Sequence, residues 1–203
     1  MQKAFSFLYK GSRKAFNTFL VYWQTVFTRA AFYLNNVHHG SFKTTGIPYV
    51  SIAWKAHCSI GPGFSMHNGL NGNPIGRPQK CVFVVNRNSS LTIGAHVGMS
   101  CTVMNCQNSI VIEDYVTIGG GTCIYDSDFH SLDPEIRKAG KENIISRPVK
   151  IEENVFIGAH STILKGVTIG RNSIVGACSV VSKSIPPNQI WAGNPAVFIK
   201  TIA

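Results

Sequence analysis

Acidic residues are missing from the first half of this 203-residue chain. All nine Asp and Glu residues lie at Glu113 or later, whereas ten of the 19 Lys and Arg residues precede it. The remaining nine cations are balanced by the nine acids, so the formal net charge of +10 belongs to residues 1–112. This asymmetry indicates either an anionic partner for the first half, such as a membrane surface, a phosphorylated substrate or nucleic acid, or a solvated basic surface.

Three further absences narrow the class of protein. The six cysteines form no CxxC pair, which argues against structural zinc, and we expect them to be free thiols in a reducing cytoplasm. The sequence has no apolar run long enough to span a bilayer and no short apolar core followed by a cleavage site. It also lacks a recognisable nucleic-acid-binding module. We expect a cytoplasmic protein, at most peripheral to the inner face of the membrane.

Residues 1–35 have the periodicity of a helix. Apolar residues recur three and four positions apart from Phe16 through Trp23 and Phe27 to Leu34, with basic residues nearby. Two interpretations stay open at this point. The helix packs on the body of the protein or on a neighbouring subunit, or it is a basic amphipathic helix that rests on an anionic membrane.

Aliphatic residues recur every six positions in the rest of the chain. The longest series is Ile151, Ile157, Ile163, Ile169, Val175 and Val181, and the residues four positions after each are Val155, Ser161, Val167, Ser173, Ser179 and Ile185. The same step appears from Ile93 to Met99, with Val97 and Val103 four positions later, and again in a shifted frame from Ile112. A period of six predicts a solenoid whose every turn has three short strands, with the aliphatic residue pointing into the prism.

Three stretches carry a family resemblance: "IGGGTCIYDSDFHSLDPEIR", "VKIEENVFIGAHSTILKGVTIGRNSIVGACSVVSKSIPPN" and "WAGNPAVFIK". The chain resembles the hexapeptide-repeat acyltransferases, most nearly O-acetyltransferases of the maltose, galactoside and colanic-acid type. The resemblance implies an all-β fold, a left-handed parallel β-helix with an N-terminal helical appendage and one extruded loop. We expect the helical segment over residues 1–45, the β-helix over 46–190 and a tail over 191–203.

The repeat is interrupted once. From Ile124 to Ile151 is twenty-seven residues, which is not a multiple of six, so a loop must leave the coil over about residues 126–149. Its first residues, "DSDFHSLDP", include the position of the family's catalytic histidine, His130. A histidine suits the transfer of an acyl group to a hydroxyl, because it can accept the hydroxyl proton near neutral pH. Asp128, Asp126 or a backbone carbonyl could orient its second nitrogen.

Other site residues follow from the resemblance. Asn105 is a candidate for orienting the acceptor hydroxyl, and a Gly119–Gly121 run could offer N–H groups to an oxyanion. The resemblance implies acetyl-CoA as the acyl donor and no metal. The family's donor contacts fall on Ala159, Ala177, Ser182, Lys183 and Lys200. The alanines would leave room for the pantetheine arm, and the lysines would face phosphates. Where Val197 stands, related enzymes often carry a basic residue, so one phosphate contact is lost here.

The function expected from this resemblance is acetylation of a sugar hydroxyl in the synthesis of a surface polysaccharide, such as capsule, O-antigen or exopolysaccharide. The resemblance further implies a homotrimer with active sites between neighbouring prisms. A small acceptor such as an antibiotic or a free sugar is an alternative, and so is a non-catalytic β-helix scaffold. A three-histidine metal site is the main rival chemistry on this fold, but no close histidine pair accompanies His130 in the sequence.

Overall fold

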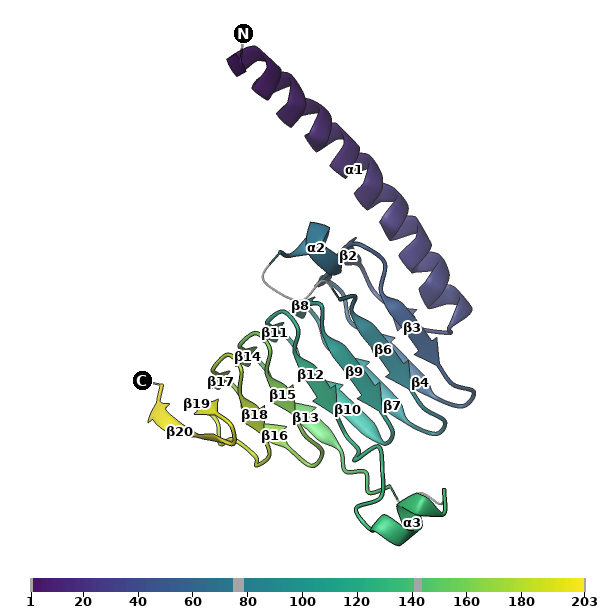
Figure 1. Ribbon diagram of the computed structural model, residues 1–203, viewed down its shortest axis with the longest axis vertical. Helices are drawn as coiled ribbons and strands as arrows, with labels where there is room; N and C mark the ends of the chain where they lie inside the picture. The colour runs from purple at the N-terminus through teal and green to yellow at the C-terminus, as the bar shows by residue number, and fades with distance from the viewer. Residues whose placement is uncertain (1, 75–78, 141–143, 203) are drawn as a thin grey trace.

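The computed structural model describes residues 2–74, 79–140 and 144–202, in which the chain winds into a three-sided prism preceded by a long helix (Figure 1). Each turn contributes one strand to each side, and strands of successive turns pair in parallel. Ile60, Ile93 and Ile112 are therefore neighbours in one sheet. The architecture is the expected left-handed parallel β-helix.

The described strands form three sheets. Sheet A contains β1 (His38–His39), β4 (His57–Ile60), β7 (Ser90–Ile93), β10 (Ser109–Ile112), β13 (Val149–Ile151) and β16 (Thr168–Ile169). Sheet B contains β2 (Phe42–Thr45), β5 (Phe64–His67), β8 (Gly98–Ser100), β11 (Thr117–Ile118), β14 (Phe156–Ile157), β17 (Ile174–Val175), β19 (Gln189–Gly193) and β20 (Ala196–Thr201). Sheet C contains β3 (Tyr49–Ile52), β6 (Val82–Val85), β9 (Val103–Cys106), β12 (Cys123–Tyr125), β15 (Thr162–Ile163) and β18 (Val180–Val181).

The interior of the prism confirms the six-residue period. All six residues of the series that begins at Ile151 are at most 1% exposed, and the residues four positions after them are buried as well. Val103 departs from this pattern. Val103 is half-buried on the outer face, and Met104, five residues after Met99, points inward instead. The corner between β8 and β9 is one residue shorter than the other corners, and this shifts the alternation of inward and outward side chains in β9.

The corners of the prism need special backbone conformations. We name the three edges by the sheets that they join: A–B, B–C and C–A. His96 on the A–B edge and His160 on the B–C edge, which both end an "IGAH" stretch, occupy corners with positive φ angles of 56° and 60°. Gly158 is required by contact, since a Cβ there would lie 2.4 Å from the backbone nitrogen of Ala177 in the next turn.

The ends of the β-helix differ from the expected boundaries. The coil begins with β1 at His38 rather than at residue 46, and Phe32 closes its first turn with its ring 5.3 Å from that of Phe42. The chain also leaves the coil between β5 and β6, where it forms α2 (Gly69–Gly72), an excursion that the repeat count missed. Residues 189–201, which include most of the expected tail, form an antiparallel β19–β20 hairpin.

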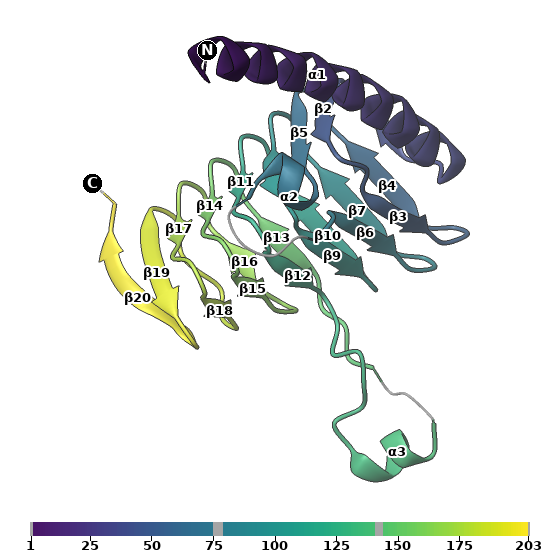
Figure 2. The same cartoon turned by 45° about the horizontal axis from the view of Figure 1, so that its top comes forward.

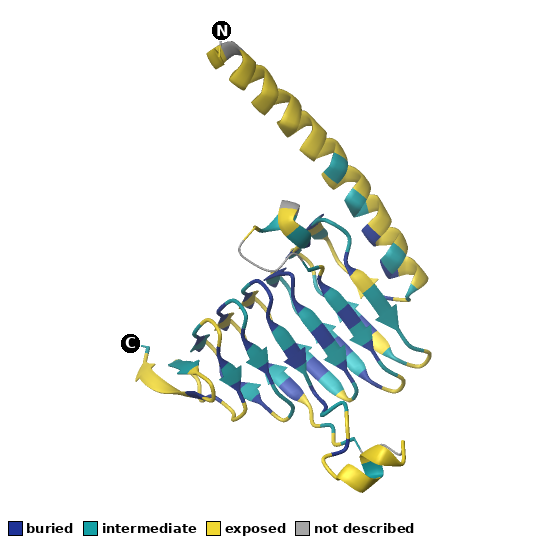
Figure 3. Ribbon diagram, viewed as in Figure 1, coloured by how far each residue is buried: buried dark blue, intermediate teal, exposed yellow. Residues whose placement is uncertain are grey.

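The N-terminal helix α1 (Gln2–Leu34) contacts the coils only near its C-terminal end, mainly through β2. Figure 3 shows most of α1 exposed. The predicted apolar face of Phe16, Trp23, Phe27 and Leu34 is itself exposed, so it does not pack on the chain's own coils. Among the described helices, none has a stretch long and apolar enough to cross a membrane.

Candidate active site

The extruded loop leaves the prism at the C–A edge, between β12 and β13, and projects away from the coils (Figure 2). Its two ends are held together at the root. Ser127 and Ser146 form an antiparallel bridge, and the backbone N–H of Arg147 donates to the carbonyl oxygen of Asp126 at 2.8 Å. The first residues of the loop are therefore fixed to the rigid coil.

Asp126 fastens this root to the preceding turn. Its side chain is fully buried, and its two carboxylate oxygens accept the backbone N–H groups of Gln107 at 2.7 Å and Asn108 at 2.8 Å. The thiol of Cys106 lies 3.3 Å from one of these oxygens. These contacts place Asp126 in a structural position, where it caps a corner of the neighbouring turn.

Asp128 points to a different partner, the ammonium group of Lys165 on the next turn along the C–A edge. Both side chains are about one-fifth exposed, at 19% for Asp128 and 24% for Lys165. The pair ties the loop to the turn above it. Sequence reasoning missed Lys165, although the coil period places it one turn beyond Asp126 on the same edge.

His130 is exposed, and its neighbours in the chain are held firmly. Phe129 has a positive φ of 62°, and its ring meets Tyr125 edge to face at 5.0 Å. After His130, Asp133 caps the short helix α3 (Pro134–Lys138) by accepting the N–H of Glu135 at 2.8 Å. The third acid of the "DSDFHSLDP" stretch thus begins a helix. The Asp-Pro pair in the sequence predicts such a helix start.

Arg137 of α3 was also missed by sequence reasoning. Its guanidinium donates to the carbonyl oxygens of Ser131 at 2.7 Å and Leu132 at 3.2 Å. These two residues follow His130 directly, so α3 folds back and fixes the segment that carries the imidazole.

Asn105 lies on the outer face of sheet C beside Tyr125, its register partner on β12. Its side-chain oxygen accepts from the amide of Asn86 at 3.2 Å, so this row of polar groups crosses three turns. Burial raises the pKa of Tyr125 to about 12, which keeps the phenol protonated as a donor.

The five expected donor-binding residues lie in two places. Ala159 and Ala177 stack on the B–C edge, where the turns approach closely. Ser182 and Lys183 line a pocket of about 310 Å³ at the C-terminal end of the prism, together with Trp191, Val197 and Phe198. Lys200 is exposed on β20, opposite Ile190. Two of the three expected oxyanion donors are already used, since the N–H groups of Gly119 and Gly121 donate to the carbonyl oxygens of Ile157 and Ser100.

The imidazole and the alanine edge are separated within one chain. His130 leaves the C–A edge, whereas Ala159 and Ala177 lie on the B–C edge. These edges are separated by one side of the prism, roughly 13 Å for four extended residues. Within residues 2–74, 79–140 and 144–202, no group of three or more His, Cys, Asp and Glu side chains could hold a metal ion.

Known proteins share the six-residue repeat of the coil. Residues 148–183 match the family described as bacterial transferase hexapeptide (six repeats). This segment therefore carries the hexapeptide repeat of that family. It is 43% identical over 101 residues to the galactoside O-acetyltransferase of Escherichia coli K12, a match that covers 47% of this chain and 49% of the relative. The chain spans about half the length of the curated relatives it matches.

Solved structures agree on the fold. A hexapeptide-repeat acetyltransferase from Vibrio cholerae complexed with acetyl coenzyme A superposes with a TM-score of 0.56 and 27% identity, covering 85% of this chain and 74% of the other. AntD from Bacillus cereus, an N-acyltransferase in complex with dTDP and 3-hydroxybutyryl-CoA, gives 0.64 at 23% identity, covering 82% and 83%. At that identity, the second likeness concerns the fold alone.

Proposed function

We propose that this hexapeptide-repeat protein transfers an acetyl group from acetyl-CoA to a hydroxyl of a sugar, at sites shared between neighbouring copies in a homotrimer. One observation carries the proposal: the loop histidine and the alanine corner at Ala159 and Ala177 occupy opposite edges of sheet C. A second copy that brings its B–C edge to the His130 loop would join the two halves. The galactoside O-acetyltransferase relatives support the chemistry.

In the proposed reaction, the imidazole of His130 accepts the proton of the acceptor hydroxyl as its oxygen attacks the thioester carbonyl. The new C–O bond forms, the C–S bond breaks, and the imidazolium returns its proton to the departing thiolate. Asp126, Asp128 with Lys165, and Arg137 hold the backbone on both sides of His130. These residues act as positioning residues, and Asn105 is proposed to orient the acceptor.

The described residues fit the proposed donor. The edge at Ala159 and Ala177 carries only methyl side chains, along which we propose that the extended pantetheine arm lies. The pocket at Ser182, Lys183 and Trp191 offers a hydroxyl, a cation and an aromatic surface to the nucleotide end. Lys183 and Lys200 supply positive charge for phosphates, in the absence of a basic side chain at Val197.

We propose an acceptor glycan of surface polysaccharide synthesis, either anionic or lipid-linked, because the first 112 residues carry ten cations and no acid. We place the reaction in the cytoplasm, where the free thiols of this chain stay reduced. A screen of neutral, anionic and lipid-linked sugars for CoA release tests the acceptor class. Turnover only with a small antibiotic or a free neutral sugar would contradict this part of the proposal.

The chemistry is tested by His130→Ala, with His57→Ala as the matched control on an exposed histidine of β4. We expect CoA release to fall by about 10²–10⁴-fold for His130→Ala and to stay at the wild-type rate for the control. An unchanged rate in His130→Ala would remove the imidazole from the mechanism. The shared site is tested by mixing His130→Ala with Ala177→Trp, each inactive alone.

If the imidazole and the alanine edge come from different copies, random mixed trimers regain about one quarter of the wild-type activity, since one interface in four then joins two intact halves. If both halves come from one chain, mixing restores nothing. The second result would refute the shared site and leave the acetyl transfer itself standing.

A further inference from the structure

Helix α1 has a stripe that faces the coils. The side-chain oxygen of Gln24 accepts the backbone N–H of Gly46 at 2.7 Å, and Thr28 and Phe32 are fully buried. These residues are four apart, so they lie on one side of the helix. The same side continues toward the N-terminus through Asn17 and Lys10 at helical spacing. We call it the coil-side stripe.

All four cations in the first half of α1 lie on this side. At roughly 100° per residue, Lys3, Lys10, Arg13 and Lys14 fall within one half of the helix circumference, centred on the coil-side stripe. Asn17 and Val21 line the same surface groove as the last three of these cations.

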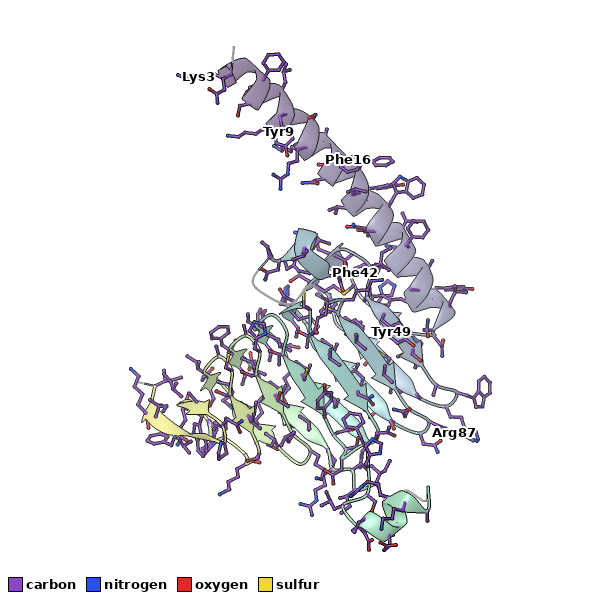
Figure 4. The ribbon with its side chains drawn as sticks, viewed as in Figure 1. Lys3, Tyr9, Phe16, Phe42, Tyr49 and Arg87 are labelled. Atoms are coloured by element: carbon purple, nitrogen blue, oxygen red, sulfur yellow. The ribbon has the colours of Figure 1, made fainter. Side chains whose placement is uncertain are left out.

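The opposite side is aromatic. Phe5, Tyr9, Phe16, Phe19, Trp23 and Phe27 form what we call the aromatic face, and they are between 43% and 68% exposed. Figure 4 shows Phe16 on the side of α1 that faces away from the coils and Lys3 on the other side. No described part of the chain covers this face, so a flat partner could reach its whole length.

The charge of the helix selects the kind of partner. The helix carries five cations and no acid. A second copy of α1 would bring the same positive charge to the contact, which opposes pairing. An anionic lipid surface would attract the cations and take the aromatic side chains into its interfacial layer.

We propose that α1 lies in the plane of an anionic membrane surface, with its aromatic face in the lipid and its coil-side stripe toward the β-helix. The cations lie on the water side of the helix, close enough to the lipid for the negative surface potential to attract them. The coils are then held just below the lipid surface, on the water side. This inference is independent of the proposed acetyl transfer, because it needs no substrate.

The experiment is flotation of the full-length protein with two kinds of vesicle, pure phosphatidylcholine and phosphatidylcholine with about 30% phosphatidylglycerol. We expect the protein to float with the anionic vesicles and only weakly with the neutral ones. Phe16→Ser with Trp23→Ser should lower the partition coefficient roughly tenfold or more, because two large apolar side chains no longer enter the lipid. Lys10→Gln with Lys14→Gln should lower it about fivefold per charge on anionic vesicles.

The matched control is Tyr49→Ser with Trp54→Ser, which removes two exposed aromatic residues from the coils and should leave flotation unchanged. Circular dichroism of every variant confirms that the helix and coils remain folded. Failure of the folded wild type to float, or equal flotation with neutral vesicles, overturns the proposal. A third outcome also overturns the proposal. If the wild type does not float, and light scattering shows a smaller oligomer for the Phe16→Ser, Trp23→Ser variant than for the wild type, then the aromatic face binds a second copy of the chain.

Discussion

Replacement of Asp126 tests whether this carboxylate supports the fold or the chemistry. In Asp126→Ala, the backbone N–H groups of Gln107 and Asn108 lose their buried acceptors at 2.7 and 2.8 Å. Each hydrogen bond to a charged acceptor contributes about 1.5–3 kcal/mol, so the free energy of unfolding should fall by about 3–6 kcal/mol. That is a large fraction of the stability of an ordinary domain, about 5–15 kcal/mol.

Asp126→Asn is the sharper variant. Its amide oxygen can still accept one N–H, but its NH₂ group then faces the other donor. We expect a loss of about 1.5–3 kcal/mol in the free energy of unfolding, measured by urea denaturation. Asp128→Asn serves as the comparison, because its partly exposed pair with Lys165 should contribute at most about 1 kcal/mol.

The result that would refute this reasoning is a normal unfolding midpoint for Asp126→Asn together with a large fall in CoA release. Asp126 would then act on the imidazole, and its contacts with the preceding turn would be dispensable. We expect the reverse: lower stability, and a loss of turnover that is smaller than that of His130→Ala.

Two further predictions concern the coil. Gly158→Ala should lower the free energy of unfolding by about 1–3 kcal/mol in thermal or urea melts, because the new methyl group would lie 2.4 Å from the backbone of the next turn. The control is Gly11→Ala on α1, where the added methyl group meets no other atom, and it should be neutral or slightly stabilising. Burial raises the pKa of the thiols of Cys58, Cys81 and Cys106 to about 12, so a thiol reagent at pH 8 should label the exposed Cys178 and spare these three in the native protein. These thiols ionise at a higher pH in the folded state than in the unfolded state, where their pKa is about 8.5. Below that pH the free energy of unfolding should therefore not depend on them. Above it, the free energy of unfolding should fall by about 1.4 kcal/mol per pH unit for each thiol. Equal labelling of all six cysteines, or urea midpoints that do not move between pH 8 and 11, would contradict the burial argument.

The sequence predicted the parts of the molecule that follow from periodicity. The inward residues from Ile151 to Val181 and the loop after β12 both come from counting sixes, because the coil repeats its backbone at each turn. Val103 escaped this count, since one shortened corner reverses the alternation of the following strand. The start of the coil at His38 escaped it too, because β1 and β2 have no regular repeat to mark them.

The site was predictable as a location and only partly as a set of contacts. His130 follows from the motif, and Asp133 could have been recognised as a helix cap. The contact between Asp128 and Lys165 joins residues 37 positions apart, and finding it requires the turns to be stacked in register first. The exposed aromatic face of α1 depends on which side of the helix meets the coils, and that side is set by Gln24 and Thr28, which are polar residues that an apolar pattern ignores.

The prism is closed at one end by Phe32 and at the other by the reversed strand β20. A parallel coil with a bare terminal rung could recruit further chains end to end and grow into a fibre. With Phe32 packed against the first turn and β20 reversing the direction of sheet B, the length of the coil is set by the turns between these two ends. Ile151 and Ile169 are eighteen residues apart in successive turns, so evolution or an engineer can lengthen or shorten the protein in units of eighteen and leave both ends in place.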